Sequence, residues 1–116
     1  MVYQSNAPVY VQIADDIKEQ IVRGALPDGE KLSSVREYAI HYEVTMLTVQ
    51  RAMQLLETEG VIQTRKGVGS FVVSGTAAVL ADRMVRERVR EFVSRMKNMG
   101  MAHETILNLV KEELER

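Results

Sequence analysis

Apolar residues recur every three or four positions along residues 9–22, which is the spacing of one face of an α-helix. The members of this stripe are Val9, Ile13, Ile17, Ile21 and Val22. Gly24 is expected to end the helix, and residues 26–29 carry the proline and glycine that are typical of a turn. We expect this helix to pack across the elements that follow it and to supply much of the core.

Two shorter helical patterns follow, and each begins with a residue that can cap a helix. Ser34 and Glu37 have the spacing of a capping box. Thr45 offers a second capping hydroxyl, and the helix after it is expected to run to about Glu59, with Gly60 ending it. The apolar faces of the two helices comprise Val35, Tyr38, Ala39 and Tyr42, then Val49, Ala52, Met53 and Leu56. Two helices joined by a short turn allow the second to lie in the major groove of DNA.

Two strand-like runs come next, at residues 61–64 and 70–73, and a basic segment with two glycines separates them. That segment contains Arg65, Lys66, Gly67, Val68 and Gly69. A hairpin tip of this kind can approach a phosphate backbone closely, because glycine lacks the Cβ atom that would collide. The pattern therefore predicts a mostly α-helical fold with a small β-hairpin, namely a winged helix-turn-helix over residues 1–75.

Residues 76–116 follow a predicted hinge at residues 74–76 and contain two further amphipathic patterns. The apolar stripe of the longer one consists of Val85, Val89, Phe92, Val93 and Met96. After a break at residues 99–101, the stripe of the shorter one consists of Ile106, Val110 and Leu114. Apolar stripes with little to cover them usually mark a partner surface, and a two-fold homodimer is the commonest solution. We therefore expect residues 76–116 to form a two-helix dimerisation segment.

Composition narrows the class of protein. The 116 residues contain no cysteine, which excludes disulfides and thiolate metal sites and is consistent with a cytoplasmic protein. No apolar run approaches the ~20 residues that a membrane span needs. No nucleophile stands beside a base in a recognisable motif, so we expect neither an enzyme nor a cofactor. Glu37 and His41 have a spacing that could bind a metal, but a helix cap and a surface histidine are the simpler interpretation.

The formal net charge is −1, whereas many DNA-binding proteins are basic. Phosphate neutralisation is local, however, so the positions of the cations matter more than their total. The first helix carries Asp15 and Asp16, which we expect on a solvated face. The cations of the expected reading surface are Arg36, Arg51, Arg65 and Lys66.

Several separated motifs, in order, resemble the GntR family of bacterial transcription regulators over residues 8–73. These motifs are residues 8–13, Gly24, Gly29, and residues 32–36, 48–52, 56–60 and 67–72. The short two-helix tail resembles the YtrA-type subgroup, whose small C-terminal part serves dimerisation. The resemblance implies a DNA-binding domain without the large effector domain of other subgroups.

The resemblance also implies roles for individual residues. Arg36 matches a family arginine that contacts the DNA backbone or a base. The recognition-helix positions near the groove are matched by Thr48, Gln50 and Arg51, and the wing by Gly67 and Gly69. The full set expected to face double-stranded DNA is Ser34, Arg36, Thr45, Thr48, Gln50, Arg51, Arg65, Lys66, Gly67 and Gly69.

The chain departs from the family pattern at two places. Ser33 stands where the family usually has proline, which affects only entry into the helix. Met46 and Leu47 stand where the family usually has polar or basic residues, so a base-reading arginine is missing. Either specificity shifts to Gln50, Arg51 and methyl contacts with thymine, or DNA binding is weaker than the resemblance implies.

These observations predict a homodimeric, sequence-specific DNA-binding regulator, most simply a repressor, on an operator with two half-sites. Two alternatives remain. In the first, the tail or its interface holds an unknown small-molecule effector that changes the spacing of the two reading heads. In the second, the chain is a protein-interaction module with weakened DNA binding, which Met46, Leu47 and the acidic balance favour.

Overall fold

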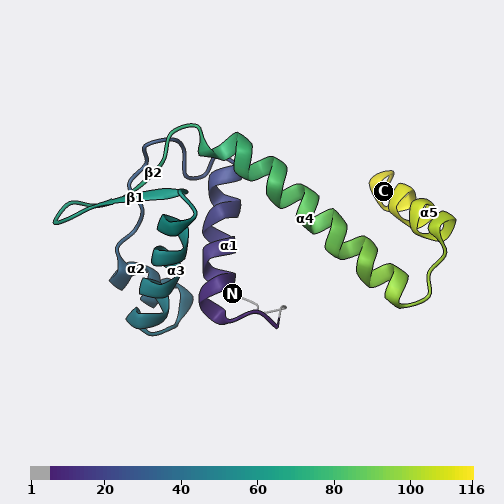
Figure 1. Cartoon of the computed structure of the whole chain (residues 1–116), viewed down its shortest axis with the longest axis horizontal. Helices are drawn as coiled ribbons and strands as arrows, with labels where there is room; N and C mark the ends of the chain where they lie inside the picture. Colours follow the sequence, from purple (N-terminus) through teal and green to yellow (C-terminus); the bar gives the residue numbers. More distant parts are fainter. Residues whose placement is uncertain (1–5) are drawn as a thin grey trace. The chain divides into compact units, whose positions relative to one another are not determined.

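The structure is a computed structural model that describes residues 6–116. Across these residues the chain forms five α-helices and one two-stranded antiparallel sheet, which confirms the predicted fold class (Figure 1). The chain divides into two compact units, of which the first ends at Leu80 and the second comprises Ala81–Arg116. The predicted first domain, residues 1–75, begins with residues 1–5, which lie outside the described part. None of the helices in residues 6–116 combines the length and the apolar character that crossing a membrane requires.

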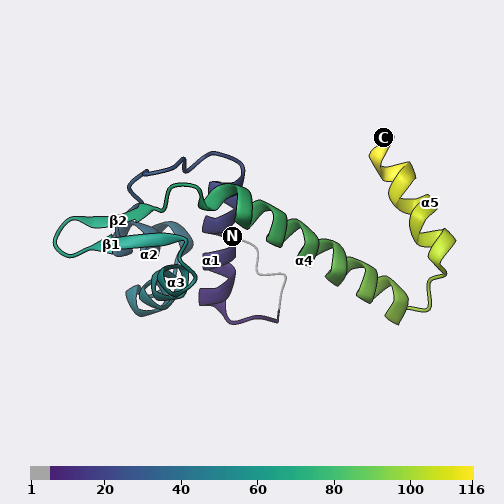
Figure 2. The same ribbon diagram turned by 45° about the horizontal axis from the view of Figure 1, so that its top comes forward.

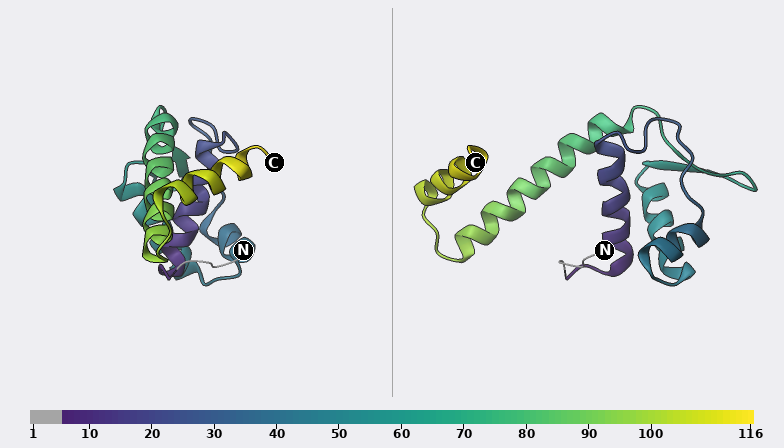
Figure 3. Two further views of the ribbon diagram at one scale, coloured as in Figure 1. Left: turned by 90° about the vertical axis from the view of Figure 1, so that its right-hand side faces the viewer. Right: turned by 180° about the vertical axis from the view of Figure 1, so that it is seen from behind.

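Three helices form the body of the first unit: α1 (Val9–Val22), α2 (Val35–Tyr42) and α3 (Met46–Thr58). The helix α3 packs against both α1 and α2, and α1 and α3 lie side by side (Figure 3). The buried side chains of this body include Ile13, Ile17, Ile21, Tyr38, Tyr42, Val49, Met53 and Leu56. Burying one large aliphatic side chain contributes about 1.5–3 kcal/mol, so this shared core supplies most of the unit's stability.

The starts of α2 and α3 follow the local signals in the sequence. Ser34 Oγ accepts a hydrogen bond from the Glu37 backbone N–H at 3.1 Å, and Glu37 Oε1 accepts one from the Ser34 N–H at 2.8 Å. This reciprocal pair is the predicted capping box. Thr45 Oγ1 accepts a hydrogen bond from the Thr48 N–H at 3.2 Å, which confirms Thr45 as the cap of α3.

The two helices end by reversing the backbone into the left-handed region. Gly60 has a φ of 74°, and the Val61 N–H donates to the Leu56 carbonyl at 2.9 Å, which is the predicted glycine-terminated end of α3. At the end of α2 the same reversal falls on Glu43, with a φ of 56°. Among the described residues Glu43 is the only non-glycine residue with a positive φ, so the turn between the two helices stores backbone strain.

The hairpin consists of β1 (Ile62–Arg65) and β2 (Gly69–Val72), each shifted by one residue from its predicted position. A further segment lies along the free edge of β2, because the Leu32 N–H donates to the Ser70 carbonyl at 2.9 Å. Backbone hydrogen bonds therefore hold β2 on both of its edges. Beyond this base the hairpin projects from the helices as a wing (Figure 2).

Two polar links tie α1 to the helix-turn-helix. The Tyr42 hydroxyl donates to an Asp16 carboxylate oxygen at 2.5 Å, and the Gln20 amide donates to the same oxygen at 3.2 Å. Burial raises the pKa of Tyr42, and the hydrogen bond to Asp16 raises it further. The expectation that Asp16 lies on a solvated face was wrong, because its partner Tyr42 arrives from another helix.

The second link joins the middle of α1 to the end of α3. The Lys18 ammonium lies 2.6 Å from Glu59 Oε1 and 2.9 Å from Glu59 Oε2. Lys18 is buried, so removing Glu59 would leave a buried charge without its nearest partner. Together the two links hold α2 and α3 at fixed positions on α1.

The predicted hinge at residues 74–76 is a tight turn. Gly75 has a φ of 83°, and its N–H donates to Asp28 Oδ2 at 3.1 Å. The helix α4 (Thr76–Asn98) begins directly after this turn, and Leu80 in its second turn is only 2% exposed. The start of α4 therefore belongs to the first unit.

The second unit contains the remainder of α4 and α5 (His103–Leu114). The predicted break lies at Met99–Met101, where Gly100 has a φ of 82° and the Met101 N–H donates to the Met96 carbonyl at 3.1 Å. Ile106 is buried, whereas Val93 and Met96 are half-buried. The other members of the two predicted stripes are exposed, namely Val85, Val89, Phe92, Val110 and Leu114.

Candidate nucleic-acid interface

The start of α2 presents one of the predicted cations. Arg36 is the second residue of this helix and is exposed. Ser34, by contrast, uses its hydroxyl in the capping box, so it orients the helix start. The hydrogen bonds from the Ser34 backbone and side chain lower the pKa of Glu37, with a smaller contribution from the charge of Lys31. The Glu37 carboxylate is therefore charged and occupied in the cap.

The exposed face of α3 carries the predicted recognition residues. At about 100° per residue, Leu47, Arg51 and Gln54 lie nearly opposite the buried face, and Gln50 lies to one side. Thr48 is half-buried, and its hydroxyl lies 3.0 Å from that of Thr45. Gln54 joins this face although the sequence motifs did not single it out; the helical period alone identifies it.

The first turn of α3 exposes two apolar side chains. Met46 is 48% exposed and Leu47 is 59% exposed. Neither contributes to the core, so their apolar character is not required by the packing of α3. This face of the recognition helix is thus apolar at its start and polar further along.

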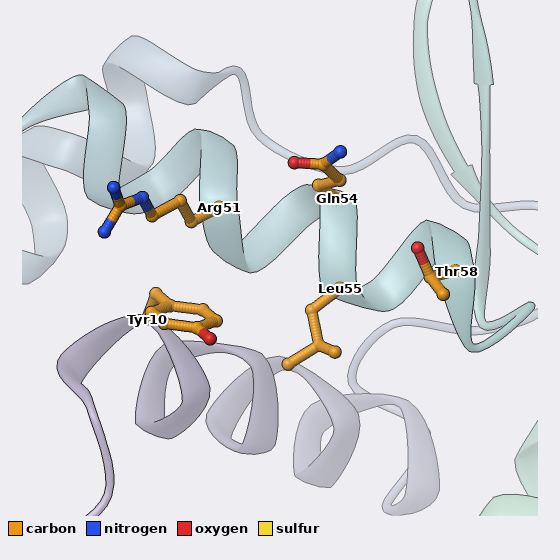
Figure 4. Close-up of a pocket in the computed structure, with 5 residues that line it drawn as sticks. All are labelled: Tyr10, Arg51, Gln54, Leu55 and Thr58. Carbon is orange, nitrogen blue, oxygen red and sulfur yellow. The ribbon is translucent and has the colours of Figure 1, made fainter.

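A shallow, open hollow of about 340 Å³ lies between α3 and α1 (Figure 4). Arg51, Gln54, Leu55 and Thr58 line it from α3, and Tyr10 lines it from α1 (Figure 4). Arg51 thus lies on the exposed face of α3 and also borders this hollow beside α1.

The wing carries the remaining predicted residues. The Arg65 guanidinium carbon lies 4.8 Å from the centre of the Phe71 ring, a cation–π distance that holds the side chain across the hairpin. Lys66 is exposed in the turn, where the Val68 N–H donates to the Arg65 carbonyl at 2.9 Å. Gly67 has a φ of 78°, which a residue with a side chain adopts only at a cost.

At Gly69 the backbone conformation is again unusual, and a neighbouring side chain also lies close to the backbone. The φ of Gly69 is 144°, and a Cβ atom at this position would lie 2.6 Å from Cε of Lys31. The structure thus adds Lys31 to the wing, a residue that the sequence motifs missed. Lys31 belongs to the segment paired with β2, and only the strand pairing brings it there.

The described residues offer no metal centre: no three His, Cys, Asp or Glu side chains gather within residues 6–116. His41 packs edge-on against Tyr42, with ring centres 4.7 Å apart. The candidate interface comprises the start of α2, the exposed face of α3 and the wing. All three belong to the first unit.

A compact helix-turn-helix with a wing defines a class of DNA-binding domain, and comparison with known proteins gives the family. The model of the bacterial regulatory proteins of the gntR family matches residues 9–72. The chain belongs to the GntR family, whose members are transcriptional regulators with a DNA-binding domain and not enzymes.

The similarity to individual relatives extends beyond the winged domain. The chain is 40% identical over 111 residues to the HTH-type transcriptional regulator YhcF of Bacillus subtilis, covering 94% of this chain and 92% of that protein. It is 30% identical over 112 residues to the HTH-type transcriptional repressor YtrA of B. subtilis, covering 94% and 86%. A GntR family transcriptional regulator from Listeria monocytogenes has a similar structure, with a TM-score of 0.83, 33% identity, and coverage of 95% and 98%. The resemblance to the YtrA-type subgroup is therefore confirmed.

Proposed function

We propose that the chain is a homodimeric repressor that binds an operator with two half-sites, one for each winged unit. The main support is that one compact unit presents an exposed α3 face, the start of α2 and a basic wing, within a family of DNA-binding regulators. A target in chromosomal DNA implies action in the cytoplasm.

Each cation has a role that follows from its position in the interface. Arg51 and Gln50 on α3 read base edges in the major groove, where arginine pairs with guanine. Arg36 contacts the backbone or a base at the start of α2. Arg65 and Lys66 on the wing neutralise phosphates and carry no sequence information of their own.

Met46 and Leu47 fit a role in reading thymine. The methyl group of thymine lies in the major groove and is read by apolar contact. Two exposed apolar side chains at the start of α3 supply such contacts without a polar partner. We therefore expect an operator with A·T pairs at the positions nearest this turn.

Dimerisation is assigned to the apolar stripes of α4 and α5. The side chains of Val89 and Phe92 are 56% and 43% exposed and lie on one face of α4. Only contact with a partner would remove this apolar face from water. The proposed seam comprises Val85, Val89, Phe92, Val93, Met96, Ile106, Val110 and Leu114. The repressor assignment rests on the relative YtrA, which is named a repressor and aligns with both units of the chain.

An electrophoretic mobility assay with the promoter of the chain's own operon tests the function. A specific, competitor-resistant shift at nanomolar to tens of nanomolar protein is expected, since specific affinities at physiological salt are ~10⁻⁸–10⁻¹¹ M. The exposed Met46 and Leu47, with the acidic balance of the chain, favour one alternative, a protein-interaction module. That alternative predicts equal, weak binding to promoter and unrelated DNA.

A further inference from the structure

The Lys31 side chain lies across Gly69, at the end of the hairpin that is next to its turn. If Gly69 carried a Cβ atom, that atom would lie 2.6 Å from Lys31 Cε and 3.5 Å from Nζ, so the lysine stem runs directly over the glycine backbone. The Lys31 backbone also pairs with Phe71 in an antiparallel bridge. Because residues directly opposite each other project to the same side of a sheet, Lys31 and Phe71 share one face of the wing.

Arg65 lies on the same face. It is the partner of Gly69 in the hairpin register, and Gly69 is two residues from Phe71, so all three share a side of the sheet. The 4.8 Å distance from the Arg65 guanidinium to the Phe71 ring agrees with this. The opposite face carries Ile62 and Val72, which are buried. The outer face of the wing thus presents two cations. Arg65 comes from β1, and Lys31 comes from the segment that pairs with the other edge of β2.

The charge of Lys31 also reaches the first turn of α2, where it lowers the pKa of Glu37. The Glu37 carboxylate is held by the Ser34 N–H at 2.8 Å, and within the described residues Lys31 has no ion pair. Lys31 therefore stands between two elements of the interface, the wing and the start of α2. A phosphate that passes from one to the other would meet its ammonium.

We propose that Lys31 is a DNA-phosphate contact, and that a side chain at Gly69 would displace the end of the Lys31 side chain from this position. This inference rests on the proposed DNA-binding function. A lysine ammonium binds phosphate as a point charge, so the contact adds affinity without sequence preference. Gly67 differs, because no atom lies within 4 Å of a Cβ placed on it, and its glycine serves only the turn.

The test measures how binding to operator and to unrelated DNA depends on salt. Lys31→Gln is expected to reduce the slope of log K against log[salt] by about 1.8 on both DNAs, that is, about 0.9 for one neutralised phosphate in each of the two protomers. Lys31→Arg keeps the charge and is expected to keep the wild-type slope. The matched control is Lys97→Gln, an exposed lysine of the second unit, which is expected to leave the slope unchanged.

If the Lys31→Gln variant shows the same slope as the wild-type protein on both DNAs, and the wild-type protein binds the operator, the proposal is overturned. The proposed function then still stands. A wild-type protein that binds no DNA would overturn both. Circular dichroism confirms that each variant is folded.

Gly69→Ala supplies an independent variant. It is expected to reduce the slope in the wild-type background by displacing Lys31, but to leave the slope unchanged in the Lys31→Gln background. The backbone strain at a φ of 144° lowers affinity in both backgrounds, and the cycle separates this from the effect of the charge. Equal slope changes in both backgrounds would show that Gly69 does not act through Lys31.

Discussion

The two units differ in how completely they bury their apolar side chains. In the first unit, Ile13, Ile17 and Leu56 are fully buried, and polar links such as Asp16 with Tyr42 join the helices. In the second unit, Ile106 is the only buried residue among those described, and most of both stripes stays exposed. A unit with a complete core does not need a partner to bury its apolar side chains. An exposed apolar stripe, by contrast, gains free energy when a partner removes it from water. We therefore propose that the first unit folds alone and that the second folds against a partner.

The electrostatic patterns of the two units differ in the same way. The first unit buries Lys18 against Glu59, and its exposed cations lie at the start of α2, on α3, on the wing and, for Arg23, after the end of α1. In the second unit charges follow the helix surface, as in the pair of Arg86 with Asp82 at 3.0 Å. Exposed pairs of this kind contribute little, about 0–1 kcal/mol.

The largest expected effect comes from placing charge in the proposed seam. Val89→Asp with Phe92→Asp buries uncompensated carboxylates at the contact and is expected to split the dimer. Because useful affinity requires two linked heads, operator binding should fall by about 10²–10⁴. Sedimentation equilibrium should report a monomer, while amide exchange protection in α1 and α3 persists.

The matched control for the seam variant lies on the other side of the same helix. Ser94→Asp with Asn98→Asp adds the same charge at exposed positions about half a turn away from the stripe. It should remain dimeric and bind the operator. If the seam variant stays dimeric as well, the interface lies elsewhere on the chain.

A cavity in the core should affect the first unit alone. Leu56→Ala removes a fully buried side chain and is expected to lower the free energy of unfolding by about 2–5 kcal/mol. Leu114→Ala removes an exposed leucine of α5, and its effect on the first unit is expected within about 0.5 kcal/mol. For both variants, the free energy of unfolding of the first unit is measured by urea denaturation, with hydrogen exchange in residues 9–72 as the readout. Equal losses would mean that the first unit depends on the second for stability.

Truncating the reading cations should weaken DNA binding without changing the dimer. Arg51→Ala and Arg36→Ala are each expected to cost about 1–3 kcal/mol of operator binding, through a lost base or charge-assisted contact. Arg95→Ala, an exposed arginine of α4, is the control and should bind normally. Titration by fluorescence anisotropy measures the affinities, and unchanged values for both variants would remove these residues from the interface.

Most of the fold could be predicted because its signals are local. The capping box at Ser34, the cap at Thr45 and the glycine end at Gly60 each depend on residues within one helical turn. The stripe of α1 identifies its buried face in the same way. Strand ends were displaced by one residue, because the register depends on pairing across the hairpin, as between Arg65 and Gly69.

The candidate site could be predicted only in part, for the same physical reason. Arg36 and Gln50 follow from motif position and from the helical period. Lys31 was missed because its place at Gly69 depends on a bridge between segments far apart in sequence. The partner of Asp16 was missed for the same reason, since Tyr42 lies 26 residues away.

The smallest expected effect concerns the turn of the helix-turn-helix. Glu43 adopts a left-handed conformation, with φ 56° and ψ 48°, although glycine is the residue that usually occupies this conformation. A residue with a Cβ atom loses about 1–2 kcal/mol there, and asparagine tolerates the conformation better because its short side chain bonds to nearby backbone. Glu43→Asn is therefore expected to raise the free energy of unfolding by about 0.5 kcal/mol.

Glu57→Asn is the matched control for the turn. It makes the same change at an exposed position within α3, where helix propensity predicts a small loss of a few tenths of a kcal/mol. Urea denaturation at a single protein concentration compares the two, since the proposed dimerisation would make the free energy of unfolding depend on concentration. Opposite signs for the two variants would identify backbone strain at the turn as the cause. A loss of stability in Glu43→Asn equal to that of the control would mean that the Glu43 side chain makes a compensating contribution to the first unit.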